Sequence, residues 1–400
     1  MKKIILLFLC LVCIVITSCA YGDDIPFADE ASGLETLATE NQQQTIDKIE
    51  YSKISFLGAG DNIVYYGTVR DAQKNASVSG DRVYNFKPIY SEVASLIESA
   101  DVSFINQETL MCGDGYEFSY YPCFNGPQDM GYDLAELGFD VIGMANNHML
   151  DKGSNGLLKT IEFWDTIPVT TVGGYKNKED YNTIRVHEEQ GVKIAFLAFA
   201  EHTNGLSNSK NGSVYIPYLN EANIEELVAD AKEVADLVFV SVHWGDEGAF
   251  KPNDNQKKYA KIFADSGVDV VIGHHPHVIQ PVEWIEGKDG NKTLCVYSLG
   301  NFMAEQAYAY NMVGGMISFD IVSVNNTKPT IENVVFIPTV FDWGAAFYDN
   351  RVYLLENYTE EMANNHGIKS YGRKTSLSQL RGYVSSTISD EFLSDSYKNK

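Results

Sequence analysis

The sequence is poor in basic residues, in cysteine and in long apolar runs. Each of these shortages argues against certain classes of protein. Only 30 of its 400 residues are Lys or Arg, against 54 Asp or Glu, so its formal net charge is −24. A surface with so few cations is unsuited to the phosphate contacts that nucleic acid binding needs, and we expect no nucleic acid partner. No repeat and no second change of composition interrupts the chain, which favours one large domain.

The only long apolar run lies at the start of the chain. Residues 4–16 are apolar but too few to span a bilayer comfortably, and Lys2 and Lys3 precede them, as in a secretory signal. The end of this run, Ile16-Thr-Ser-Cys19, resembles a bacterial lipobox. We therefore expect residues 1–19 to be a lipoprotein signal peptide and lipidated Cys19 to hold an exported protein on a membrane. The alternative is a plain secretory signal with an incidental cysteine, and the protein is exported in either case.

Residues 20–50 are polar, acidic and rich in glutamine, and they are expected to form a flexible tether between the membrane and the domain. The remaining cysteines are few. Cys112 and Cys123 lie in a loop rich in Gly and Tyr, where an oxidising compartment would permit a disulfide, although both could equally remain free thiols. Cys295 falls in an apolar run and is expected to be an inert core thiol.

From residue 51 to residue 400, apolar runs alternate with helical patterns. Strands are predicted at 53–61, 101–108, 139–145, 169–172, 236–243, 268–273 and 293–302, with a hairpin at 183–188 and 193–200 and an antiparallel pair at 316–324 and 331–340. Helices are predicted at 87–99, 129–138, 154–165, 223–235, 255–266, 353–364 and 376–386. Strands separated by helices predict an α/β layered sheet with right-handed crossovers.

Polar side chains stand where five of these strands end. They are Asp61, then Asn106 with Glu108, then Asn147 with His148, then His243, and finally His275 with His277. Five of the eight histidines of the chain lie in these segments, which chance scatter would rarely produce. Because open α/β folds bind ligands at the carboxyl ends of their strands, we expect these side chains to share one site. Taken singly, Asp61 could be a helix N-cap, and Asn106 and Glu108 could be solvated polar residues.

The segment Val268–His277 has the highest density of potential ligands. A buried strand ends at Gly273, and three histidines follow within four positions. Pro276 disfavours helical conformation in the residue before it, so we expect an extended segment in which His275 and His277 point to the same side. The alternative is a surface loop that happens to be rich in histidine.

Imidazole, carboxylate and amide oxygen together form a mixed N/O donor set without thiolate. Such a set suits manganese, iron or zinc in an open catalytic site better than a closed structural zinc site. Asp151 follows His148 by three residues, where a helix start would bring it within reach of the imidazole. His148, oriented by Asp151, is therefore predicted to be a general acid for a leaving group.

Six motifs together are similar to one family. They are Gly58-Ala-Gly-Asp61, Asn106-Gln-Glu-Thr109, Ala145-Asn-Asn-His-Met-Leu-Asp-Lys-Gly153, His243-Trp-Gly-Asp-Glu247, Gly273-His-His-Pro-His277 and Ser298-Leu-Gly-Asn-Phe302. Their order and spacing, from about residue 53 to residue 304, resemble the bacterial capsule synthesis family CapA, or PGA_cap. The resemblance implies a calcineurin-like metallophosphoesterase sandwich of β-sheets flanked by helices. It also implies a role in making, anchoring or exporting a cell-surface polymer such as poly-γ-glutamate.

Within these motifs, Asp61, Glu108, Asn147, His243, His275 and His277 are the expected metal ligands, and Asn106, Glu247 and Asn301 are expected to contact substrate. The sequence departs from the superfamily pattern at three places. No histidine follows Asp61 in the first motif, Glu108 replaces the usual bridging aspartate, and the last histidine motif is stretched, which leaves the role of His274 open. One metal ion or two are therefore both compatible with the sequence.

Two functions from different classes follow. The first is a metal-dependent hydrolase or transferase, phosphoesterase-like, that acts on a phosphoester or an amide bond of an anionic cell-surface polymer or its phosphorylated precursor. The second is a non-catalytic component of a polymer synthesis and export complex that binds the polymer or a membrane partner. In both, the expected location is outside the cytoplasm on a membrane, and membrane-bound synthesis or export proteins are expected partners.

Overall fold

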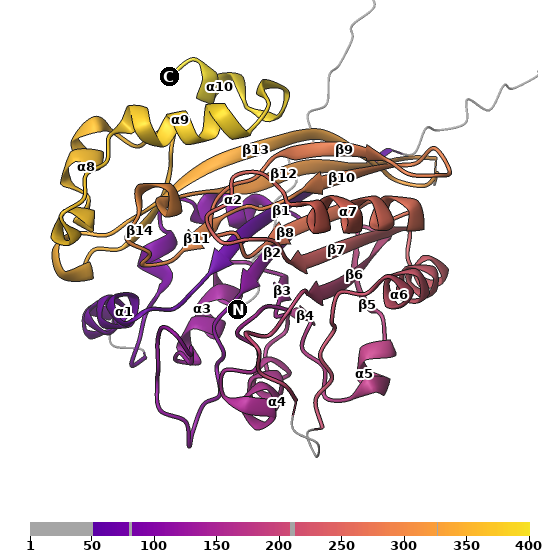
Figure 1. The fold of residues 1–400 in the computed structure, drawn as a ribbon, viewed down its shortest axis with the longest axis horizontal. Helices are drawn as coiled ribbons and strands as arrows, with labels where there is room; N and C mark the ends of the chain where they lie inside the picture. The colour runs from indigo at the N-terminus through magenta and orange to yellow at the C-terminus, as the bar shows by residue number, and fades with distance from the viewer. Residues whose placement is uncertain (1–50, 80–81, 209–212, 326) are drawn as a thin grey trace, which may run out of the picture. The chain divides into compact units, whose positions relative to one another are not determined.

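Two β-sheets pack together in the structure, a computed structural model, with helices on their outer sides (Figure 1). The structure describes residues 51–400 except 80–81, 209–212 and 326. The expected signal peptide (1–19), the lipidated Cys19 and the tether (20–50) lie outside the described residues. Among the residues described, no helix is long and apolar enough to cross a membrane.

The first sheet has eight strands in the order β14-β13-β12-β1-β2-β3-β4, with β11 paired to β1. Its strands are β1 (Tyr51–Asn62), β2 (Val102–Gln107), β3 (Val141–Gly143), β4 (Thr170–Val172), β11 (Asn301–Met303), β12 (Val313–Val324), β13 (Thr330–Asp342) and β14 (Arg351–Leu354). β1 to β4 run parallel, and β12 to β14 are antiparallel to their neighbours. The carboxyl ends of β1, β2 and β3 therefore meet at one edge.

The second sheet has six strands in the order β5-β6-β7-β8-β10-β9. They are β5 (Arg185–Glu189), β6 (Val192–Ala200), β7 (Leu237–His243), β8 (Val270–His274), β9 (Val282–Glu286) and β10 (Lys292–Val296). The inner four strands are parallel, and β5 and β9 are antiparallel edge strands. Here β7 and β8 end side by side, with His243 paired to His274.

Ten α-helices and several short 3₁₀ turns connect the strands among the described residues. The helices are α1 (Tyr66–Ser79), α2 (Ala94–Ser99), α3 (Asp129–Glu136), α4 (Gly153–Trp164), α5 (Lys178–Asn182), α6 (Glu221–Val234), α7 (Asp254–Ser266), α8 (Glu360–Asn365), α9 (Leu377–Thr387) and α10 (Asp395–Lys398). The 3₁₀ turns are Lys87–Tyr90, Ala309–Met312, Ala345–Phe347, Gly367–Tyr371 and Asp390–Phe392.

The alternation of side chains along a strand explains why the strands of the second sheet are continuously apolar. On β7, Phe239 faces the core shared by the two sheets, whereas Val238 and Val240 face the core under α6 and α7. Both faces are therefore buried, as expected for a parallel sheet covered on two sides. Aromatic rings join the sheets, since Phe56 of β1 lies edge-on to Phe239, with ring centroids 5.3 Å apart.

The predicted fold class is confirmed, because the molecule is a mixed α/β structure with two sheets flanked by helices. Three predicted elements are wrong in detail. The helix expected at 353–364 is the end of β14 followed by the short helix α8, the helix expected at 87–99 is a 3₁₀ turn followed by α2, and the strand expected at 293–302 is β10 and β11 separated by a turn. Five helices and strands were not predicted from the sequence, namely α1, α5, α10, β9 and β14.

The possible disulfide is absent, and both cysteines are free thiols. Cys112 is buried, and its Sγ lies 3.5 Å from the carbonyl oxygen of Gly156 in α4, whereas Cys123 is exposed. The two side chains therefore occupy different environments. Cys295 is an inert core thiol as predicted, fully buried, and burial raises its pKa well above the usual range.

Candidate metal centre

Asp61 and Asn106 end neighbouring strands and lie opposite each other in the β1–β2 register. Asn106 donates a hydrogen bond from Nδ2 to Asp61 Oδ1 (2.8 Å), and the backbone N–H of His275 donates to Oδ2 (3.2 Å). Nδ1 of His274 and Nδ1 of His277 each lie 3.2 Å from an Asp61 carboxylate oxygen. Burial alone would raise the pKa of Asp61, but these two imidazoles hold it well below its usual range.

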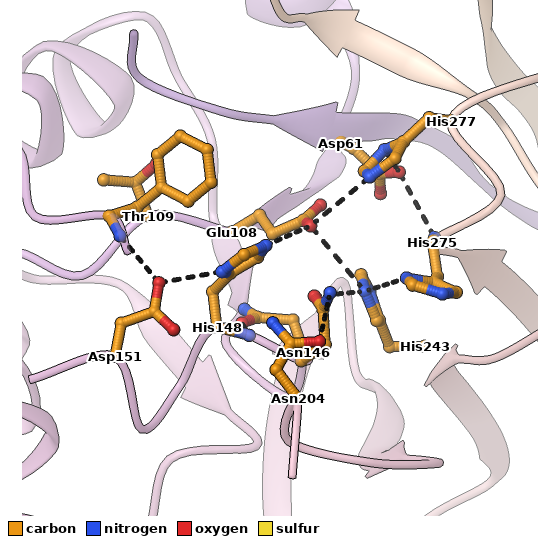
Figure 2. A network of polar contacts seen from close by, with 12 residues as sticks. Asp61, Glu108, Thr109, Asn146, His148, Asp151, Asn204, His243, His275 and His277 are labelled. Carbon is orange, nitrogen blue, oxygen red and sulfur yellow. Dashed lines mark hydrogen bonds and ion pairs between the residues drawn. The ribbon is translucent and has the colours of Figure 1, made fainter. Parts of the chain in front are cut away.

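Glu108 lies at the centre of the cluster (Figure 2). Its side chain is fully buried, and neither carboxylate oxygen has a hydrogen-bond partner. Three imidazole Nε2 atoms surround Oε1 instead, those of His148 at 3.9 Å, His243 at 3.7 Å and His277 at 3.8 Å. Burial raises the pKa of Glu108 well above its usual range. A buried carboxylate without hydrogen bonds is costly unless another group satisfies it.

The loop after β3 carries the predicted pair of His148 and Asp151. Nδ1 of His148 lies 2.7 Å from Oδ2 of Asp151, and this oxygen also accepts the backbone N–H of Phe124 at 2.6 Å. The ring of Phe124 packs edge-on against the imidazole. With its Nδ1 side held by Asp151, His148 directs Nε2 toward Glu108, as Figure 2 shows. The pairing that the three-residue spacing predicts is therefore formed.

His243 joins the two sheets at the site. Its Nε2 lies 2.9 Å from Oδ1 of Asn147, which follows β3, and 3.1 Å from Nδ1 of His275, which follows β8. Asn147 in turn donates from Nδ2 to Asn204 Oδ1 at 3.2 Å. Burial, followed by the neighbouring His275, lowers the pKa of His243 well below its usual value. The strand ends predicted to meet do meet, although they belong to two different sheets.

The geometry expected for His275 and His277 is wrong. Instead of an extended segment, both residues have positive φ, 96° and 54°, so the chain forms a tight turn around Pro276. Residues other than glycine rarely adopt this conformation, and it persists only where the surroundings fix it. Here the N–H of Gly248 donates to the carbonyl of Pro276 at 2.8 Å, and that of His275 donates to Asp61. The two imidazoles still face the same cluster.

Two residues expected to contact substrate are buried and make hydrogen bonds within the protein. Asn106 and Asn301 are both 0% exposed. Asn106 binds Asp61, and Asn301 donates from Nδ2 to the carbonyl of Asn311 and the side chain of Gln306, both at 3.0 Å. These amides therefore hold in place the segments that carry the expected ligands.

Glu247, the third expected substrate contact, is exposed at the rim of the cluster and reaches the ligand atoms of His275 and His277. Two residues were not predicted. His274 lies beside Asp61 with its Nε2 unpartnered, and His202 sets its exposed ring edge-on to His275, with centroids 5.1 Å apart. His202 follows β6 by two positions, so the signal used for the other strand ends would have found it.

His275 and His277 differ in charge at neutral pH. Burial, followed by His277, lowers the pKa of His275 to about 3. Burial alone would also lower the pKa of His277, but the carboxylates of Glu108 and Asp61 outweigh it and raise this pKa to about 9. At neutral pH His277 is therefore a cation beside the carboxylate of Asp61, whereas His275 is neutral.

The residues fit a divalent metal. Two overlapping groups have ligand atoms within 4.8 Å of one another, Asp61 with Glu108 and His277, and Glu247 with His275 and His277. The orphaned carboxylate of Glu108 stands 3.7–3.9 Å from its imidazole neighbours, wider than a hydrogen bond and suited to donors that share an ion. Oxygen and imidazole donors without thiolate favour manganese, iron or zinc.

The fold and the site define a class, namely a two-sheet α/β protein with a buried histidine–carboxylate centre where strands of both sheets end. Within it, the chain belongs to the family described as bacterial capsule synthesis protein PGA_cap, which matches residues 53–306. It is 33% identical over 190 residues to the PGA biosynthesis protein CapA of Bacillus subtilis (47% of this chain, 48% of that protein). It is also 33% identical over 197 residues to the capsule biosynthesis protein CapA of Bacillus anthracis (47% and 46%).

A probable polyglutamine synthesis accessory protein of Mycobacterium tuberculosis is 26% identical over 246 residues (58% of this chain, 62% of that protein). The alignments with the two Bacillus proteins cover about half the length of each of those proteins, 48% and 46%. Among solved structures, the chain is similar to NAD nucleotidase of Haemophilus influenzae (13% identity, TM-score 0.43, covering 88% of this chain and 66% of that one). It is similar, too, to the calcineurin-like phosphoesterase YfkN of Bacillus subtilis (14%, 0.38, 71% and 91%).

Proposed function

We propose that this chain is a metal-dependent hydrolase or transferase of the cell envelope that acts in the biosynthesis of a capsule polymer such as poly-γ-glutamate. Its substrate is the anionic polymer or a phosphorylated precursor of it. The observation that carries the proposal is the orphaned carboxylate of Glu108, surrounded by three imidazoles, beside the His148–Asp151 pair. The names of the family and of the Bacillus relatives support the biological role.

Each residue has a distinct part in the proposed chemistry. Asp61, Glu108, Asn147, His243, His275 and His277 hold the metal, with Glu247 at the exposed side. When bound, the ion polarises a phosphoryl or carbonyl oxygen of the substrate. Asp151 accepts a hydrogen bond from Nδ1–H of His148, so the imidazole can carry its second proton on Nε2, which faces the cluster. From there His148 donates this proton to the leaving group.

The proposal extends to location and partners. Export by residues 1–19, a lipid on Cys19 and a tether over residues 20–50 would keep the catalytic domain at the membrane surface. Polymer made by membrane-bound synthesis or export proteins would then pass close to it. The names of the two Bacillus relatives, which refer to PGA and capsule biosynthesis, support this location.

The test begins with metal content. The full-length chain, purified without added metal or nickel affinity, is analysed by mass spectrometry beside the double variant His275→Ala/His277→Ala and the control His187→Ala, whose histidine lies on edge strand β5 outside the cluster. We expect stoichiometric manganese, iron or zinc in the wild type and the control and its loss in the double variant. A wild-type chain that neither contains nor takes up metal would contradict the proposal.

A second candidate is a non-catalytic component of a polymer synthesis and export complex that binds the polymer or a membrane partner. The burial of the site favours it, because every proposed ligand except Glu247 is 7% exposed or less. The metal-loaded chain is therefore assayed with phosphoesters and with poly-γ-glutamate. Turnover that requires metal and His148 supports the enzyme, whereas bound metal without turnover on either substrate class supports the second candidate.

A further inference from the structure

Tyr65 directly precedes α1 and follows the expected ligand Asp61 by four positions. Its backbone is fixed, because its N–H donates to Thr68 Oγ1 (2.9 Å) and its carbonyl accepts the hydroxyl of Thr68 (2.8 Å). The proposed metal ligands other than Glu247 are buried, whereas Tyr65 keeps part of its surface in solvent. A molecule that enters from solvent can therefore reach this side chain.

The ring of Tyr65 is joined to the proposed general acid through one aromatic neighbour. It packs edge-on against Phe124, with ring centroids 5.2 Å apart, and Phe124 packs edge-on against His148, with centroids 4.7 Å apart. The backbone N–H of Phe124 also donates to the carboxylate of Asp151. Tyr65 thus lies one ring away from the His148–Asp151 pair.

The hydroxyl of Tyr65 is held by a chain of amides that leads to His277. The side chain of Gln306 forms a hydrogen bond with this hydroxyl, and because the bond lowers the pKa of the phenol, Gln306 is the donor. Oε1 of Gln306 accepts from Nδ2 of Asn301 at 3.0 Å, and the same Nδ2 donates to the carbonyl of His277 at 3.4 Å. The amides therefore fix the phenol oxygen relative to a segment that carries proposed ligands.

The hydroxyl proton of Tyr65 remains available to a ligand. A phenol can both donate and accept, and Gln306 uses only its accepting side. Three carboxylates act on the phenol, but Glu108 and Glu247 belong to the two candidate metal donor sets, and Glu305 caps the first turn of α1. Burial, followed by these carboxylates, raises the pKa of Tyr65 well above its usual value. The side chain is therefore a neutral donor at physiological pH.

A donor in addition to the metal and the general acid suits one of the two proposed substrate classes better. In amide hydrolysis, negative charge develops on a single carbonyl oxygen, the atom assigned above to the metal. In phosphoryl transfer, the charge is spread over three equatorial oxygens, which need donors on more than one side. A fixed phenol that keeps its proton meets this need.

We propose that the hydroxyl of Tyr65 donates a hydrogen bond to a non-bridging oxygen of a phosphoryl group bound at the metal centre. This inference rests on the proposed function, of which it selects the phosphoester substrate class. His148 gives its proton to the leaving oxygen, whereas Tyr65 keeps its proton and stabilises the negative charge on a different oxygen.

The test uses the full-length chain loaded with manganese, and inorganic phosphate is the probe. Isothermal titration calorimetry measures the phosphate affinity of the wild type and of two variants. Tyr65→Phe keeps the ring against Phe124 and removes only the hydroxyl, so we expect it to weaken phosphate binding about tenfold or more. Tyr66→Phe is the matched control, because Tyr66 is 57% exposed and packs against Tyr120 instead. It should bind phosphate as the wild type does.

Metal content, measured by mass spectrometry, separates this inference from the proposed function. Tyr65→Phe should hold as much metal as the wild type, and loss of metal would make Tyr65 a ligand and overturn the inference. Equal phosphate affinity in the wild type and Tyr65→Phe would overturn it too, as would a wild type that binds no phosphate. A wild type that takes up no metal contradicts the proposed function instead, and the same phosphate comparison on the metal-free chain then decides the role of Tyr65.

Discussion

The proton that His148 would donate lies on Nε2, because Asp151 binds the other ring nitrogen, Nδ1. If His148 is the general acid, His148→Ala should lower turnover by roughly 10²–10⁴-fold while metal content stays at the wild-type level. Asp151→Asn should lower turnover less and shift the alkaline limb of the pH profile to lower pH, because an amide stabilises the imidazolium poorly. Metal analysis and pH–rate profiles of both variants check this. Unchanged turnover in His148→Ala would remove it from the mechanism.

A second histidine, His366, can form its present contacts only when neutral. Its Nε2–H donates to the carbonyl of Phe341 (3.1 Å), and its Nδ1 accepts the N–H of Ile368 (3.1 Å). Burial lowers its pKa to about 4. Between pH 6.5 and 4 the unfolded chain therefore binds a proton that the folded chain does not. Above pH 6.5, neutral His366 should make its full contribution to the free energy of unfolding. As the pH drops toward 4, the free energy of unfolding should fall by up to about 3 kcal/mol.

The variant His366→Asn isolates this effect, since an Asn side chain can accept the same N–H and does not titrate. Urea unfolding at several pH values should give a shallower loss of stability between pH 6.5 and 4 in the variant than in the wild type. Equal slopes would mean that His366 is not the group responsible. Asp342, whose pKa burial raises to about 6, remains in both proteins and cancels in the comparison to first order.

For single residues, the sequence predicts which positions lie at the site better than it predicts their backbone conformation and their contacts. The ends of the predicted strands correctly locate the clustered side chains of Asp61, Glu108, His148, His243, His275 and His277. A polar side chain at the end of a buried strand is costly unless it has partners, so such residues tend to gather at a site. The positive φ angles of His275 and His277 could not be predicted, since distant contacts with Asp61 and Gly248 stabilise them. Nor does the sequence distinguish a substrate contact from a buried support such as Asn301.

Among secondary-structure elements, β8 depends on a close approach at Gly273. A Cβ atom there would lie 2.0 Å from the carbonyl oxygen of Tyr297 and 2.7 Å from Nε1 of Trp244. Gly273→Ala should therefore cost about 1–3 kcal/mol of stability and displace the ligands that follow, which weakens metal binding. Gly382 in α9 is the matched control, because a Cβ there meets nothing within 4 Å.

Gly382→Ala should stabilise the protein by about 0.5–1 kcal/mol, since alanine is the better helix former. Denaturant unfolding measures both changes, and metal titration measures the second effect of Gly273→Ala. If both alanine variants changed the free energy of unfolding in the same direction, the close contact at Gly273 would not explain why this position requires glycine.

The sequence pattern does not predict the elements that are stabilised by residues far away in the sequence. α1 has a weak apolar stripe, and its first turn is capped by the carboxylate of Glu305, which accepts the backbone N–H groups of Gly67 and Thr68 from more than 230 positions away. β14 is short and owes its conformation to pairing with β13. In contrast, β7 and β8 are fully buried apolar runs, and the sequence predicts them correctly.

In the whole molecule, the metal centre should contribute to stability. Asp61, Glu108 and His277 form a buried charged group with unsatisfied oxygens, and an ion bound only by the folded state stabilises by about 2.7 kcal/mol at a hundred times its Kd. EDTA should therefore lower the midpoint of thermal unfolding by several degrees, and manganese or zinc should restore it. The double variant His275→Ala/His277→Ala should respond to neither. A wild-type midpoint insensitive to both treatments would contradict a metal centre of this affinity.

The periodicity of the sequence also leaves the division into two sheets open, because strands that alternate with helices are equally compatible with one continuous sheet. The resemblance to a known family implied the sandwich. The physical reason for two sheets lies in long-range aromatic contacts such as Phe56 with Phe239, whose partners the local pattern cannot reveal.

The two sheets each carry an incomplete donor set. Asp61 and His275 are 214 positions apart, and the first sheet supplies the two buried carboxylates while the second supplies Glu247 and most of the imidazoles. The second sheet alone brings together Glu247, His275 and His277, whereas Asp61 and Glu108 join them only after the two sheets have docked. If the chain binds a metal as proposed, a treatment that separates the sheets while each stays intact should weaken metal binding before the secondary structure is lost, because it removes Asp61 and Glu108 from the donor set.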